Sequence, residues 1–244
     1  MSETSESAVS KEVAELLKRR KPNYISLLAV VSEELRRFKD RPSFHDVIYR
    51  IYSRADKQIG GQPLKAGWKI TKKLSEWRVK KPSTQMIDIH DIIGVTVVTY
   101  FTSQRKIVSK ALQTPNSLGE LEIVQREEKN AKGYYATHLV ATSTKQPRSG
   151  LLCEIQVKTL LDDGWATKTH DFTYKPKSGI QINPELQAQI DILGDSIQLI
   201  ERQSDIVRKL IEHESSRDKK RRTAAQQERN CSRGLLRCPR CSHI

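Results

Sequence analysis

Apolar and polar residues alternate along residues 152–159, whose sequence is Leu-Cys-Glu-Ile-Gln-Val-Lys-Thr. Successive side chains of a strand point to opposite faces, so the apolar Cys153, Ile155 and Val157 would share one face and the polar residues between them the other. The polar residues are Glu154, Gln156 and Lys158. Taken alone, the stretch predicts an edge strand with a solvated polar face, and a strand that carries a row of reactive groups is the alternative.

A second strand is predicted within residues 89–100, which are almost continuously apolar after Asp91 and rich in β-branched side chains. Such a composition is typical of a strand that is buried on both faces. Asp91 lies at the polar start of this run, where an ionised carboxylate can stay partly hydrated and bind a hard cation. A turn or a cap is the other role that fits an aspartate there.

A third strand is predicted within residues 132–141, after a turn at Gly133. Tyr134 and His138 have the same parity along this strand, so an aromatic ring and an imidazole would face the same side. The pair either contributes to a site on that side or only packs across the strand.

A helix is predicted for residues 160–176, and Pro176 would end it. Leu161, Trp165 and Phe172 recur at helical spacing and would form its buried stripe. The polar residues of the segment would then point elsewhere.

Two further helical regions flank these elements. Residues 11–37 predict one or two amphipathic helices that Pro22 interrupts, and the residues after Pro184 predict a long amphipathic helix that reaches Glu214. The expected organisation is a helical segment (1–40), a synthetase-like domain (41–180), an amphipathic helix (181–214) and a basic tail (215–244) whose first part is disordered or marginally helical.

Four motifs in this chain carry a family resemblance. They are Asp-Ile-Ile-Gly-Val from Asp91, Lys-Gly-Tyr-x-x-x-His from Lys132, Glu-Ile-Gln-Val-Lys-Thr from Glu154, and Trp-Ala-x-x-x-His-Asp-x-x-Tyr-Lys from Trp165. In order and spacing, residues 44–210 resemble the synthetase domain of the RelA/SpoT family, including the small alarmone synthetases. The resemblance implies an α/β (α+β) fold of the nucleotidyltransferase-like kind, with a mixed, mainly antiparallel sheet flanked by helices.

The resemblance also implies an activity, that of an ATP:nucleotide 3′-pyrophosphokinase of the stringent response. Such an enzyme moves the β,γ-diphosphate of ATP to the 3′-hydroxyl of GTP or GDP, which gives (p)ppGpp and releases AMP. Transfer between phosphates needs Mg²⁺, and Asp91 matches the metal-binding aspartate of the family. Glu154 matches its second acid, which either completes the metal site or takes the proton of the attacking hydroxyl.

The acceptor nucleotide is expected on the strands that follow. Tyr134 matches the aromatic residue that stacks on the acceptor base, a contact worth about 1–3 kcal/mol in single-strand binders. His138 and Gln156 would hold the acceptor's sugar or phosphates. Lys158 stands where many relatives have arginine, so it would act as a point charge.

The ATP side departs from the family pattern. Lys65 and Lys73 align with its two lysines, whereas Pro63 replaces an arginine, Lys69 replaces a serine and Thr96 stands where arginine is common. A solvated, lysine-rich helix face is the alternative interpretation of this stretch. The expected ATP-binding residues are Arg54, Lys65, Lys69, Lys73 and Arg78.

Composition adds constraints on compartment and partners. With 36% hydrophobic residues in 244, the chain can form one compact core, and its first ten residues contain no apolar run. No membrane segment and no signal peptide are therefore expected, and the protein is expected to be cytoplasmic. The C-terminal helix would either pack on its own domain or, as in several small alarmone synthetases, build a homo-oligomer.

Charge motivates a rival function. The net charge of +14 exceeds what two nucleotides require and favours polyanionic partners. Some toxins of this family transfer pyrophosphate to the 3′ end of tRNA and are countered by an antitoxin. A catalytically silent nucleotide- or RNA-binding protein is a third alternative, motivated by the changes at positions 63 and 96. Retention of Asp91, Tyr134 and Glu154 argues against it.

The C-terminal cysteines suggest a metal site of another kind. A Cys-x-x-Cys pair with a further cysteine and a histidine nearby has the ligand types of tetrahedral zinc. These residues are Cys231, Cys238, Cys241 and His243. A tail with free thiols is the alternative.

Overall fold

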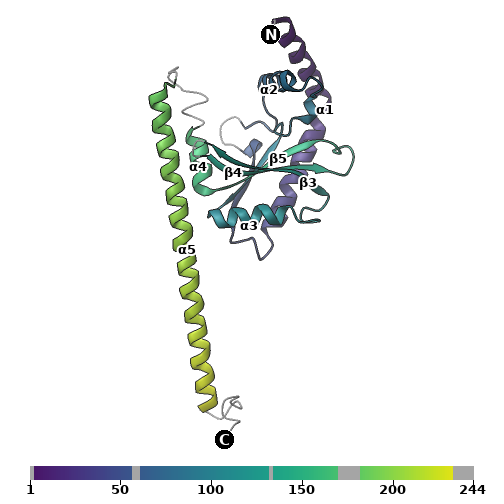
Figure 1. Cartoon of the computed structure of the whole chain (residues 1–244). Helices are drawn as coiled ribbons and strands as arrows, with labels where there is room; N and C mark the ends of the chain where they lie inside the picture. The colour runs from purple at the N-terminus through teal and green to yellow at the C-terminus, as the bar shows by residue number, and fades with distance from the viewer. Residues whose placement is uncertain (1–2, 57–60, 132–133, 170–181, 233–244) are drawn as a thin grey trace. The chain divides into compact units, whose positions relative to one another are not determined.

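The computed structural model describes residues 3–56, 61–131, 134–169 and 182–232 (Figure 1). Its helices are α1 (Glu3–Lys39), α2 (Gly67–Lys80), α3 (Thr102–Leu112), α4 (Leu160–Thr169) and α5 (Pro184–Ser232), with short 3-10 turns η1 (Arg54–Asp56) and η2 (Met86–Asp88). Its strands are β1 (Ile48–Ser53), β2 (Gly94–Thr99), β3 (Leu121–Ala131), β4 (Tyr134–Ser143) and β5 (Leu152–Thr159). Residues 1–199 form one compact unit, and the chain from Ile200 onward forms a second.

The strands form one five-stranded sheet in the order β1-β2-β5-β4-β3. Only the β2–β5 pair is parallel, so the expectation of a mixed, mainly antiparallel sheet is confirmed. Strand β5 is central and not at an edge, so the interpretation of residues 152–159 as an edge strand was wrong. Alternation cannot distinguish the two, because a central strand with one apolar face alternates in the same way.

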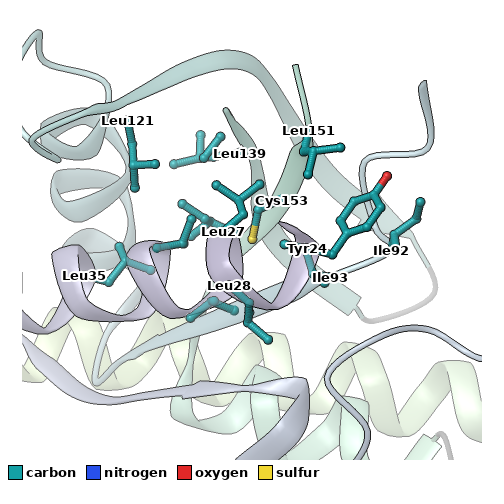
Figure 2. Close-up of a cluster of buried hydrophobic side chains, with 14 of the residues drawn as sticks. Tyr24, Leu27, Leu28, Leu35, Ile92, Ile93, Leu121, Leu139, Leu151 and Cys153 are labelled. Carbon is teal, nitrogen blue, oxygen red and sulfur yellow. The ribbon is translucent and has the colours of Figure 1, made fainter. Parts of the chain in front are cut away.

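The hydrophobic core lies on the face of the sheet opposite the polar residues. Cys153, Ile155 and Val157 of β5 are fully buried in one cluster with the inward side chains of α1, as the alternation predicted. Figure 2 shows Tyr24 and Leu27 of α1 in this cluster together with Cys153. Burial of one leucine side chain stabilises the fold by about 1.5–3 kcal/mol. The buried leucines of α1 therefore hold this helix against the sheet.

Helix α1 contradicts one expectation, because it continues through Pro22. A proline inside a helix removes one hydrogen bond and crowds the preceding turn, which commonly ends the helix. Here Val13 before the proline and Tyr24 and Leu27 after it are all buried in the core. Packing on both sides of Pro22 therefore outweighs its local cost.

Three other elements differ in extent from the sequence prediction. Strand pairing begins at Gly94, so Asp91 lies in the turn before β2, although Ile92 and Ile93 are buried. Helix α4 buries Trp165 but leaves Leu161 39% exposed, whereas Phe172 and Pro176 lie outside the described residues. Helix α5 runs to Ser232 and so includes the charged stretch after residue 214.

In place of Leu161, helix α4 turns two acids inward. Asp162 and Asp163 of its first turn are each 1% exposed.

In the described part of the chain, no helix combines the length and apolarity that crossing a membrane requires.

Candidate active site

Polar residues cross the whole sheet on the face opposite the core. Strand register aligns one residue from each strand into a single row. From β1 to β3, this row is Tyr52, Thr96, Gln156, His138 and Glu127. The polar alternation of β5 thus belongs to a polar surface that all five strands build together.

A cavity of about 620 Å³ opens over this surface. Helix α2, the turn before β2, and strands β3, β4 and β5 line it. Five of the residues expected in the site from sequence line this one cavity. They are Lys73, Asp91, His138, Glu154 and Gln156.

Two lysines hold the carboxylate of Asp91. The Nζ atom of Lys65 is 2.5 Å from Oδ2, and that of Lys73 is 2.9 Å from Oδ1. The backbone N–H of Lys65 donates to the carbonyl of Ile92 (2.8 Å), which ties the segment before α2 to this turn. Burial would raise the pKa of Asp91, but the hydrogen bonds and charges of the lysines outweigh it and lower the pKa to about 2. Asp91 is therefore ionised at neutral pH.

Glu154 is 7% exposed and is held by its neighbours on the sheet. Nδ1 of His138 lies 2.9 Å from Oε1, and the side-chain amide of Gln156 donates to Oε2 at 2.6 Å. Burial raises the pKa of Glu154, but the hydrogen bonds from His138 and Gln156 overcome it, so the net pKa is lowered. A second ionised carboxylate thus lines the same cavity as Asp91.

Tyr134 and His138 meet on one side of β4, as their parity predicted. The Tyr134 hydroxyl lies 3.1 Å from Nε2 of His138, and the two rings are perpendicular with centroids 6.1 Å apart. An imidazole with its proton on Nδ1 donates to Glu154 and accepts from the tyrosine hydroxyl. Burial, and then the charge of Glu154, raise the pKa of Tyr134, which keeps its hydroxyl protonated as the donor.

Lys158 has a carboxylate partner that the sequence analysis missed. Its Nζ atom is 3.1 Å from Oδ1 of Asp163 and 5.9 Å from the centre of the Tyr134 ring. Asp163 also accepts hydrogen bonds from Arg50 and from the hydroxyl of Tyr52, both on β1. These residues form a polar cluster next to Tyr134 on the same face of the sheet.

The remaining expected residues do not gather at Asp91. The guanidinium of Arg78 makes two hydrogen bonds to Glu12 of α1, of 2.8 and 2.9 Å. Lys69 lies 5.3 Å from the centre of the exposed Trp68 ring, and Arg54 is in η1. The four residues proposed for zinc, Cys231, Cys238, Cys241 and His243, lie outside the part of the chain whose side chains are described.

Several cavity residues were not recognised from the sequence. Glu127 and Lys129 of β3 line the cavity, as do Trp77 of α2 and His90, whose Nε2 is 3.8 Å from Glu154. Burial, and then the charge of Lys73, lower the pKa of His90, so it is neutral at pH 7. Glu127 and Lys129 have the same parity along a strand, so the sequence could have indicated that they share a face. It could not indicate that this strand, β3, belongs to the same sheet as β4 and β5.

The arrangement suits phosphorylated ligands with a hard cation. Among residues 3–56, 61–131, 134–169 and 182–232, no three His, Cys, Asp or Glu side chains are grouped to hold a metal. Mg²⁺ commonly binds only one or two carboxylates and completes its shell with water and substrate phosphates. Two ionised acids with lysines beside Asp91 therefore have the chemistry that a hard cation and phosphate groups require.

Comparison with known proteins bears on the family of the chain. Residues 63–179 match the profile of the region found in RelA/SpoT proteins. The GTP pyrophosphokinase YjbM of Bacillus subtilis is 28% identical over 152 residues, which cover 60% of this chain and 71% of that protein. The chain therefore carries a RelA/SpoT region, and the family resemblance drawn from its motifs is confirmed.

Solved structures share the fold. The small alarmone synthetase 1 of Bacillus subtilis, bound to its product pppGpp, aligns with a TM-score of 0.65 and 19% identity, over 80% of this chain and 97% of its own. A GTP pyrophosphokinase family protein of Streptococcus pneumoniae aligns with a TM-score of 0.59 and 22% identity, over 82% and 94%. The architecture is thus that of the small alarmone synthetases.

Proposed function

We propose that this protein is a small alarmone synthetase that transfers pyrophosphate from ATP to the 3′-hydroxyl of GTP or GDP. In this reaction the 3′-oxygen bonds to the β-phosphorus of ATP, the bond between that phosphorus and the α,β-bridging oxygen breaks, and AMP leaves. One observation carries the proposal. The lysine-held Asp91 and the histidine-held Glu154 line one cavity in a chain with a RelA/SpoT region.

Magnesium fits the donor set of this cavity. The carboxylates of Asp91 and Glu154 are both ionised at neutral pH and offer oxygen atoms, which hard cations prefer. A bound Mg²⁺ would neutralise the charge of the transferring phosphates. Asp91 and Glu154 are the residues that would hold it.

The chain's own residues have distinct proposed roles. Lys65 and Lys73 bind the phosphates of ATP when they are drawn away from Asp91 by the more highly charged ligand. Glu154 takes the proton of the 3′-hydroxyl, because a buried, ionised carboxylate is suited to accept it once water is excluded. Tyr134 supports the acceptor base, and His138 orients both Tyr134 and Glu154 through its two ring nitrogens.

The experiment uses the purified full chain with Mg²⁺ and ATP labelled in its β and γ phosphates. GDP, GTP, ATP and deacylated tRNA are offered separately, and the products are resolved by chromatography. We expect label on GDP or GTP in wild type and loss of product by at least a hundredfold in Asp91→Asn and Glu154→Gln. Asp46→Asn, in an exposed loop with a 95% exposed carboxylate, is the matched control and should keep full activity.

The rival function is tested in the same experiment. The net charge of +14 favours an RNA acceptor, and label on tRNA alone would replace our proposal with that of a translation-blocking enzyme. Label on no acceptor, with intact nucleotide binding, would favour a silent binding protein.

A second copy of this chain is the partner that we propose for helix α5. Several large apolar side chains of α5 remain exposed, and those near its middle are Ile206, Val207, Leu210 and Ile211. Exposed apolar residues at helical spacing are typical of a helix that packs against another helix. Self-association through α5 would cover them.

A further inference from the structure

Two adjacent aspartates in the first turn of helix α4 point in different directions. Asp163 faces the polar surface of the sheet, where Lys158 and two residues of β1 contact its carboxylate. Asp162 faces helix α3 instead, and Nη1 of Arg105 lies 3.5 Å from its Oδ2 atom. Both aspartates are 1% exposed. Because the two residues are consecutive, a group that moves Asp162 also moves Asp163 and its partners.

Thr159 connects Asp162 to the strand that carries Lys158. Its hydroxyl donates to Oδ2 of Asp162 at 2.9 Å and accepts from the backbone N–H of the same residue at 3.1 Å. A hydroxyl that bonds to the third residue of a helix is a typical N-cap. Thr159 is fully buried and follows Lys158 directly in β5. Residues 158–163 therefore form one connected segment, in which the cap holds both aspartates close to the lysine.

Helix α5 provides a further donor to this segment. The side-chain amide of Gln198 donates to Oδ1 of Asp162 at 2.8 Å, and Gln198 is 8% exposed. Residues 184–199 of α5 belong to the same compact unit as the sheet. Three large apolar residues of this part of α5 are more than half exposed, and these are Ile192, Leu193 and Leu199. Helices usually pack through their apolar side chains, so the buried amide of Gln198 selects a position that apolar burial alone would not.

The carboxylate of Asp162 depends on each of its donors. Burial raises the pKa of Asp162, and the hydrogen bond from Thr159, the charge of Arg105 and the hydrogen bond from Gln198 do not overcome this effect. Thr159 and Arg105 both approach Oδ2, whereas Gln198 bonds to Oδ1. Loss of the Gln198 amide would leave a buried carboxylate oxygen without its hydrogen bond, which is unfavourable. The first turn of α4 would then shift to recover a donor.

We propose that Gln198 of α5 is a positioning residue for the transfer reaction and acts through Asp162. Its hydrogen bond seats α5 against the first turn of α4, and this turn holds Asp163 and Lys158 against the polar surface. The Lys158 ammonium lies 5.9 Å from the centre of the Tyr134 ring. The inference rests on the proposed function and adds a control of the same site, because displacement of α5 from α4 weakens the binding of the acceptor nucleotide.

The kinetic test removes the donor and keeps the size of the side chain. In Gln198→Met we expect KM for GDP or GTP to rise about fivefold, the loss that one ordinary hydrogen bond represents, with KM for ATP and kcat within about twofold of wild type. Gln198→Asn keeps an amide on a shorter side chain, so KM should rise less. Ser196→Ala is the matched control, because Ser196 is an exposed residue of α5 that bonds to the carbonyl of Ile192, and it should change none of these values.

A double-mutant cycle distinguishes positioning from a general loss of stability. In the Lys158→Met background, Gln198→Met should raise KM for the acceptor no further, because the connection to the site is already broken. A second rise of about fivefold in that background would contradict the route through Lys158.

Amide hydrogen exchange separates this inference from the proposed function, because it requires no turnover. In Gln198→Met we expect exchange at residues 160–165 of α4 to become at least about tenfold faster, with exchange in β4 as in wild type. That result would support the inference even if no acceptor nucleotide were labelled. Unchanged exchange in α4, or a loss of protection confined to α5, would overturn it even in an active enzyme. Gln198→Asn provides the same comparison if Gln198→Met does not fold.

Discussion

Replacement of Asp91 by asparagine should reveal how strongly the two lysines stabilise the folded site. The pKa of Asp91 falls from its ordinary 3.8 to about 2, which at about 1.36 kcal/mol per pKa unit favours the ionised native form by about 2.4 kcal/mol. Its side chain is only 16% exposed, so solvent screens this interaction little. We therefore expect Asp91→Asn to lower the free energy of unfolding by about 2 kcal/mol at pH 7.

The pH dependence of this contribution has a defined direction. Because the native pKa is lowered, the stabilisation is complete above the unfolded value near 3.8 and is lost as pH falls through about 2. The difference between wild type and Asp91→Asn should thus be constant from pH 7 to pH 5. It should fall to about half by pH 3, where the unfolded carboxylate is mostly protonated and the native one is not.

Urea unfolding of Asp91→Asn, Lys65→Met and the double variant measures the interaction directly. We expect a coupling free energy of about 1–2 kcal/mol between Asp91 and Lys65, and in Lys65→Met the ion pair between Lys73 and Asp91 remains. Coupling indistinguishable from zero, or a difference between wild type and Asp91→Asn that grows toward pH 3, would refute the reasoning. Product formation provides the separate readout, because the proposed metal role predicts loss of activity even where the variant remains folded.

Three other changes have defined outcomes. Leu27→Ala should lower the free energy of unfolding by about 2–5 kcal/mol, because Leu27 is fully buried, and an effect below about 1 kcal/mol in denaturant titrations would contradict this. Tyr134→Phe loses only the hydroxyl contact with His138, so KM for the acceptor should rise less than in Tyr134→Ala, and steady-state kinetics showing equal effects would exclude a stacking role. Leu210→Glu on α5 should reduce the molar mass in light scattering, and an unchanged mass would exclude this face from self-association.

The sequence predicted which residues of the candidate site share a face of the sheet, because the signals for this are local. Alternation placed Glu154 and Gln156 on one face of their strand, and parity placed Tyr134 and His138 together. The structure brings these residues into contact, with His138 bonded to Glu154 and Tyr134. What alternation could not provide was the order of the strands, which the family resemblance left general.

Predictions failed where tertiary packing outweighed local preference or where contacts are distant in sequence. Pro22 has an unfavourable local effect on a helix, but buried residues on both sides keep α1 continuous. Asp163 follows Asp162 in a helix start, where acids are common for local reasons. Its partner Arg50 lies 113 residues away, so no pattern within either segment revealed the pair.

The shared carboxylate of Asp163 gives physical meaning to a departure from the family pattern. The resemblance drawn from the sequence implied an arginine at the position of Lys158, whose ammonium cannot form a planar fork. In this chain a guanidinium is present nonetheless, because Arg50 of β1 bonds to the same Asp163 that holds Lys158. A fork-shaped donor can therefore be retained in space although it is lost from the motif. Sites of this kind should be compared by the contacts of their side chains. A residue-by-residue alignment would show only the lysine at position 158 and would miss the guanidinium of Arg50.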